Sequence, residues 1–148
     1  MKVLFCTCAL ICATATGSMA QSLIGTWTCA RESVDNSAIS NVTFDTDGRL
    51  NALVNLTFLG LDQEVFAQAR YQSDYRFENG QLADTPVRAT LNAFTVDGAD
   101  ARQSEHATRL RNSLLQGADG AAPVTFPSET RMVISPDGGA INCVRMDG

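Results

Sequence analysis

The chain is poor in the residues that carry most enzyme and nucleic-acid chemistry. Its 148 residues include one lysine (Lys2) and one histidine (His106), against sixteen acidic residues. The remaining cations are ten arginines scattered along the chain. Nucleic acids and anionic membrane surfaces both require clustered positive charge. We therefore expect neither among the partners of this protein.

Long hydrophobic runs are also missing, since no apolar stretch reaches the roughly 20 residues of a membrane-spanning helix. The longest, from Val3 to Thr14, follows Lys2 and precedes Ser18-Met19-Ala20. A cation, a short apolar run and small residues at −3 and −1 are typical of a secretory signal peptide. We predict that residues 1–20 are cleaved after Ala20, which makes residues 21–148 a periplasmic or secreted protein without a membrane span.

Only two cysteines, Cys29 and Cys143, lie beyond the predicted signal peptide. An even pair in an oxidising compartment predicts one disulfide bond. A lipid anchor at Cys12 is the alternative, but Ala9-Leu10-Ile11 is a poor match to the small residues that such a site needs. The mature chain, with a net charge of about −6, is long enough for one domain around one core.

Alternating apolar and polar residues predict antiparallel strands. Apolar residues occupy most of the odd positions from Val65 to Phe77 and the even positions from Leu50 to Phe58. The alternation is weaker from Val87 to Val96, because apolar residues occur on both faces there. Tight turns are indicated by three dipeptides that tolerate positive φ. They are Asp47-Gly48, Asn79-Gly80 and Asp137-Gly138.

One segment follows the period of a helix. Between Asp100 and Gln116, Ala107, Leu110 and Leu114 recur at spacings of three and four, which places them on one face. We expect Asp100 to cap the start of this helix, with Gln103 reaching back, and Gly117 to end it. The glycines and prolines of residues 117–128 predict a mobile loop.

These elements predict a mainly β fold, a small antiparallel up-and-down β-barrel of about seven or eight strands with one amphipathic helix before the last hairpin. A Cys29–Cys143 disulfide would join the first and last strands and remove both sheet edges. In the chain-entropy model such a long cross-link contributes about 4–5 kcal/mol. A two-sheet sandwich remains the alternative.

The first predicted strand contains Gly25-Thr26-Trp27, and Arg145 follows near the end of the last. This is similar to the Gly-x-Trp opening of lipocalins and related calycin barrels, in which the tryptophan packs across the closed end beneath an arginine. The predicted helix departs from that pattern because it precedes the last hairpin. The resemblance implies a lipocalin-like barrel with a structural pair of Trp27 and Arg145. The alternative is a tryptophan that is simply part of the core.

No catalytic or metal-binding constellation is evident. His106 is the only histidine, no serine lies in a Gly-x-Ser-x-Gly elbow, and both mature cysteines are predicted to be bonded. The loop Asp45-Thr46-Asp47-Gly48 lacks the downstream carboxylates of a calcium site. We therefore expect no enzyme activity, no cofactor and no metal.

Two functional classes remain open, both for a monomer. In the first, the barrel interior holds a small apolar or amphiphilic ligand, with the helix as lid or plug. In the second, the domain is a protein-binding module, such as a periplasmic inhibitor of a secreted protease, that inserts the 117–128 loop or its N-terminal tail into a partner. The predicted ligand wall consists of Val54, Leu56, Phe58, Val65, Ala67, Ala69, Tyr71 and Leu91. Small inward residues, Ala93 among them, would leave room for the ligand or for close packing of the helix.

Overall fold

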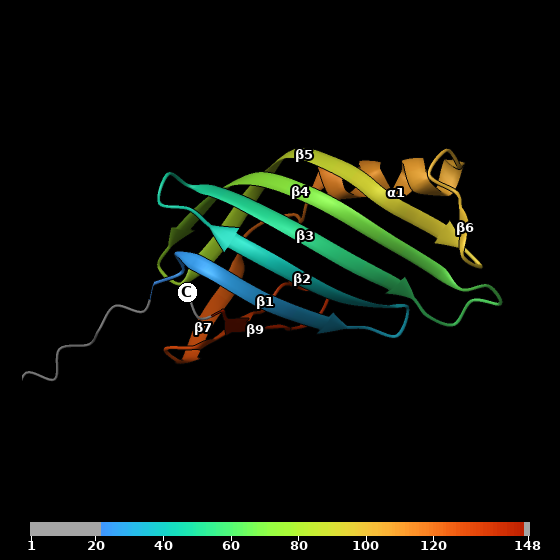
Figure 1. The fold of residues 1–148 in the computed structure, drawn as a ribbon. Coiled ribbons are helices and arrows are strands. Elements are labelled where there is room, and N and C mark those ends of the chain that lie inside the picture. Colours follow the sequence, from blue (N-terminus) through green and yellow to red (C-terminus); the bar gives the residue numbers. More distant parts are fainter. Residues whose placement is uncertain (1–21, 147–148) are drawn as a thin grey trace, which may run out of the picture.

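The structure, a computed structural model, describes residues 22–146 (Figure 1). The predicted signal peptide lies outside the described residues. Within residues 22–146 the chain forms nine strands and one helix. The strands are β1 (Gly25–Glu32), β2 (Asn36–Phe44), β3 (Arg49–Phe58), β4 (Val65–Glu78), β5 (Gln81–Val96), β6 (Ala99–Asp100), β7 (Ala122–Ser128), β8 (Arg131–Ile134) and β9 (Ile141–Arg145), and the helix is α1 (Glu105–Gln116).

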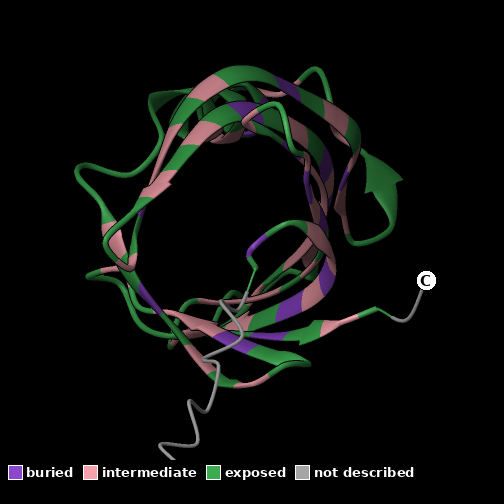
Figure 2. Ribbon diagram, turned by 90° about the vertical axis from the view of Figure 1, so that its left-hand side faces the viewer, coloured by how far each residue is buried: buried purple, intermediate pink, exposed green. Residues whose placement is uncertain are grey.

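Eight of these strands close into a ring, which Figure 2 shows end-on. Strands β1 to β5 pair in chain order, β7 to β9 continue the antiparallel sheet, and β9 returns to pair with β1. The two-residue strand β6 only extends β5 as a hairpin. The predicted up-and-down β-barrel with one helix before the last hairpin is confirmed, and the sandwich is not observed.

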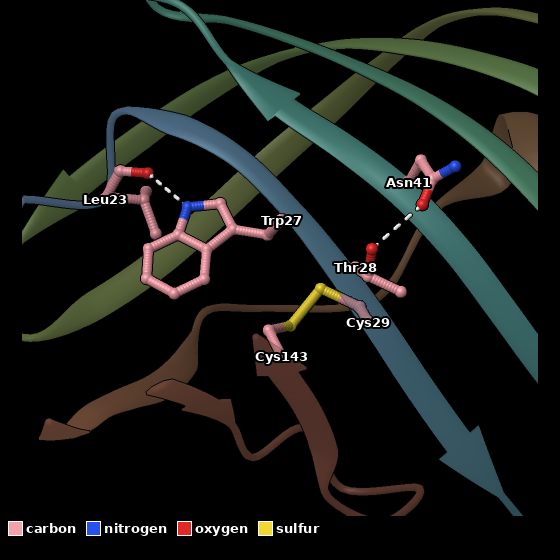
Figure 3. Close-up of a disulfide and its surroundings, with 6 residues drawn as sticks. All are labelled: Leu23, Trp27, Thr28, Cys29, Asn41 and Cys143. Carbon is pink, nitrogen blue, oxygen red and sulfur yellow. Dashed lines mark hydrogen bonds between the residues drawn. A yellow bond between two sulfur atoms is a disulfide. The ribbon is translucent and has the colours of Figure 1, made fainter. Parts of the chain in front are cut away.

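The ring is sealed covalently where the two chain ends meet. Cys29 of β1 lies directly opposite Cys143 of β9, and the two form a disulfide across a sequence separation of 114 residues (Figure 3). Both side chains are 2% exposed. The predicted bond between the first and last strands is therefore confirmed, and it lies inside the ring.

The other closure of the ring, between β5 and β7, is short. It consists of two residue pairs, Gln81 with Pro123 and Leu82 with Ala122. Beyond these pairs, helix α1 packs against β5, beside β6 (Figure 1). In that contact Ala107 joins a buried cluster with Ala67 and Phe94 from the inner wall. The inward alanine at position 67 thus serves close packing of the helix.

Strand β5 contains two register shifts, and these explain its weak alternation. Arg88 pairs with Gln72 but Pro86 with Ser73, and Ala93 pairs with Gln68 but Leu91 with Ala69. Val87 and Asn92 are the extra residues at these β-bulges. After each bulge the alternation is shifted by one residue, so positions that would have faced inward face outward. Val87 consequently points outward and is 61% exposed. The same effect places Ala93 on the outer face, so the expectation that it faces inward was wrong.

One end of the ring is closed by Trp27, which is fully buried. Its indole nitrogen donates to the carbonyl of Leu23 at 2.9 Å (Figure 3), and the Arg145 guanidinium carbon lies 4.2 Å from the ring centroid. Arg145 also donates to the carbonyl oxygens of Ser22 at 2.7 Å and Ile24 at 2.9 Å. This cation–π stack therefore ties the N-terminal segment to the end of β9.

Gly25 of the Gly-x-Trp sequence is required by the same contact. Its φ of 130° is unfavourable for other residues, and a Cβ there would lie 2.5 Å from Arg145 Nη1. The glycine leaves the space through which the guanidinium reaches the indole.

Two local predictions need correction. The N-cap of α1 is Ser104, whose hydroxyl accepts from the amide of Ala107, whereas Asp100 belongs to β6 and binds Arg102. Gly117, with a φ of 69°, ends the helix as predicted. The predicted loop over residues 117–128 was wrong in its second half, because Ala122–Ser128 forms strand β7.

Replacing both cysteines by alanine should lower the free energy of unfolding by about 4–5 kcal/mol, because the unfolded chain regains the freedom that the cross-link removes. Urea titration of the wild-type and C29A/C143A proteins measures the difference. Reductant should weaken the wild type by a similar amount and leave the variant unchanged. Equal midpoints for oxidised and reduced wild type would contradict this role for the disulfide.

Changing Arg145 to Met keeps an apolar stem but removes the cation–π stack and the hydrogen bonds to the N-terminal segment. We expect a loss of about 1–3 kcal/mol in unfolding free energy. Thermal or urea unfolding of R145M against the matched control R131M, on exposed Arg131 of β8, measures it. The same loss in both variants would show that the stack contributes nothing specific.

Candidate functional site

The ring encloses a cavity of about 420 Å³ between the Trp27 end and the helix. Its walls come from all eight strands of the ring and from the C-terminal turn of α1. The apolar lining residues include Val42, Phe44, Leu50, Ala52, Val54, Leu82, Leu114, Ile134 and Ile141. On one side the lining includes Gly117, Ala118 and Gly120, which are exposed, so the cavity reaches the surface beside the connection from α1 to β7.

The inner wall is incompletely covered by protein atoms. Ala52, Val54, Leu56 and Phe58 all lie on the inward face of β3, as their pairing with the inward residues of β4 shows, yet each is only half-buried. In a filled barrel such side chains would be fully enclosed. Their remaining exposure is what an unfilled interior produces.

The eight predicted ligand-wall residues fall into three groups. Val54 and Tyr71 line the interior cavity. Phe58 and Val65 line a second hollow of about 640 Å³ at the end of the ring near the helix. The other four line neither hollow. They are Leu56, Ala67 and Leu91, which belong to the cluster around Ala107, and Ala69, which is fully buried.

Helix α1 stands between these two hollows. Leu114 faces the interior cavity, Leu110 faces the hollow at the ring end, and Ser113 lines both. His106 and Arg109 lie at the edge of the second hollow, with His106 Nδ1 3.2 Å from Arg109 Nη2. The helix therefore contributes to the lining of both hollows while it packs against β5.

Two polar side chains in the interior were missed from the sequence. The Tyr71 hydroxyl donates a short hydrogen bond to Asp84 Oδ2, and Arg31 of β1 also lines the cavity. Burial, followed by the hydrogen bond to Asp84, raises the pKa of Tyr71 well above its ordinary value of about 10. The sequence could have indicated that Arg31 faces the interior, because Trp27, Cys29 and Arg31 are alternate residues of β1 and therefore share one face of the strand.

Among residues 22–146, no group of three or more His, Cys, Asp or Glu side chains is placed to hold a metal ion. No helix in the same range is both long and apolar enough to cross a membrane.

Comparison with known proteins adds no relative. No protein-family model matches the chain, and no curated protein matches its sequence. The geometry of the interior is therefore the basis for any functional statement.

The chain has two tyrosines, Tyr71 and Tyr75, and burial raises the pKa of both. Above about pH 10 the unfolded chain loses phenolic protons that the folded protein keeps, so stability should fall as the pH rises beyond this value. Absorbance titration of the folded protein should show less phenolate at pH 10 than titration in denaturant, where half-ionisation is expected. Tyr71→Phe should reduce the loss of stability at alkaline pH. Ordinary phenol titration in the folded protein would contradict the described burial.

Proposed function

We propose that this protein binds a small amphiphilic molecule inside its ring of strands. The observation that carries the proposal is the cavity of about 420 Å³, lined mainly by apolar side chains and interrupted by a few polar groups. Ligand pockets typically have volumes of about 300–1,000 Å³, mostly apolar walls and a small number of polar anchors. The interior has each of these properties.

The energetic reason is the exposed apolar area within the ring. Half-buried side chains on the inner face, such as Ala52 and Val54, keep surface that a ligand would remove from water. Each Å² of apolar area removed from water contributes about 25 cal/mol. The disulfide and the closed sheet hold this surface in place without a ligand, so little ordering of the main chain opposes binding.

The compartment forms part of the proposal. A disulfide between two buried cysteines fits a protein that folds outside the reducing cytosol, as the signal peptide predicted for residues 1–20 would require. We infer that the protein works in the periplasm or after secretion, where free amphiphiles need a carrier or a store.

Protein binding through the segment 117–128 has less support. Residues 122–128 pair as strand β7 with β5 and β8, and the connection before them forms one side of the cavity. An inhibitor loop would need to project from the fold, whereas this segment completes its wall.

Filling the cavity should abolish binding without affecting the exterior. Ala52 lies on the inner face and lines the cavity, whereas Ala93 lies on the outer face of β5. We expect wild type and Ala93→Trp to enhance the fluorescence of the neutral apolar dye Nile red in a saturable way, and Ala52→Trp to reduce its affinity by at least about tenfold, equivalent to 1.4 kcal/mol. Circular dichroism of both variants serves as the folding control. Equal binding by all three proteins would place the dye outside the ring and overturn the proposal.

A further inference from the structure

Arg31 lies on the inner wall of the ring, near the end where α1 sits. It follows Trp27 and Cys29 as the next inward residue of β1, and its strand partner on β2 is Ala38. The pairing of β1 with β9 stops at Ala30, so Arg31 lies beside the turn between β8 and β9. There its Nη2 donates to the Gly138 carbonyl at 2.5 Å.

The glycine of this turn leaves space for the guanidinium. A Cβ at position 138 would clash with Arg31 Nη2 and displace the end of that side chain. The hydrogen bond to Gly138 restrains the guanidinium, and Arg31 is half-buried with Nε enclosed by protein. A restrained, partly dehydrated guanidinium is preorganised for binding an anion.

Part of the hydrogen-bonding capacity of Arg31 is unused within residues 22–146, where Nη2 donates to the Gly138 carbonyl but Nε finds no acceptor. The ion pairs found within residues 22–146 are Arg49 with Asp47 and Arg102 with Asp100, and neither involves Arg31. Burying a charged donor without a partner is unfavourable, and a carboxylate can accept two parallel hydrogen bonds from one guanidinium. Because Nε is enclosed by protein, a carboxylate on a bound molecule would contact the guanidinium through its Nη atoms.

The rest of the cavity specifies what is attached to that anion. Its walls are apolar around Val42, Val54 and Ile134. The second charged group, Asp84, accepts the hydrogen bond of Tyr71 and would repel a negative head. The charged head of a bound molecule would therefore lie at Arg31, and its apolar body would extend along the wall.

We propose that the interior ligand is an amphiphile with a carboxylate head, and that Arg31 binds this head. The inference rests on the proposed interior binding and adds the chemical class of the ligand. Hydrogen bonds to charged groups contribute enough to separate a carboxylate from its uncharged analogue by roughly tenfold to a hundredfold.

The test compares two probes of equal chain length by isothermal titration calorimetry, dodecanoate and dodecanol, on the oxidised full mature protein. Wild type should bind dodecanoate at least about tenfold more tightly. Arg31→Gln should bring dodecanoate down to the affinity of dodecanol and leave dodecanol unchanged. The control Arg88→Gln removes an exposed arginine from β5 and should retain the preference.

The outcomes separate the two proposals. If dodecanol binds as tightly as dodecanoate to wild type, the carboxylate assignment is wrong while interior binding stands. The same holds if R31Q and R88Q lose the preference equally, since the effect would then come from overall charge. If wild type binds neither probe, interior binding and the assignment of Arg31 both fail.

Discussion

The pairing of β1 with β9 is the constraint on which the rest of the structure depends. These strands come from opposite ends of the chain, and the bond between Cys29 and Cys143 holds them in one register. Without this seam the sheet would have two free edges and its apolar face would be open to water. The other closure of the ring, between β5 and β7, consists of only two residue pairs. The ring therefore depends mainly on the disulfide-bonded pairing of β1 with β9.

The seam also organises the interior. Trp27, the inward residue before Cys29 on β1, stacks with Arg145 and closes one end of the ring. Arg31, the next inward residue after Cys29, lines the cavity. At the other end α1 packs by Ala107 on the inner wall and leaves the space between unfilled. The result is an apolar chamber with one arginine on its wall, which is why we propose that a ligand binds in the interior.

The sequence was sufficient where one physical rule acted alone. Strict alternation located β3 and β4, and the two remaining cysteines defined the disulfide. Prediction from the sequence failed where more than one residue or element type satisfied the same local rule. Ser104 and Asp100 are both good N-caps, and the contact of Ala107 with the wall decides between them. Strand β7 resembled a loop because prolines cannot donate a hydrogen bond to a sheet. Its two prolines nevertheless fit, because Pro123 lies in the short pairing with β5 and Pro127 lies at the register shift opposite β8.

The candidate site was predicted less completely than the fold. The inward face of β3 and β4 followed from alternation, but the division of that face between cavity and helix contact depended on where α1 docks. Arg31 and Asp84 were overlooked because charged residues are expected outside, although a charge at an inward position is the feature most informative about a ligand.

The most direct test of the account is native mass spectrometry of the oxidised protein, isolated from the cells that produce it and then incubated with their lipid extract. We predict a complex of one chain with one bound amphiphile, released when the protein unfolds. A bare chain after this incubation, with the disulfide intact, would contradict the claim that the ring is a binding chamber.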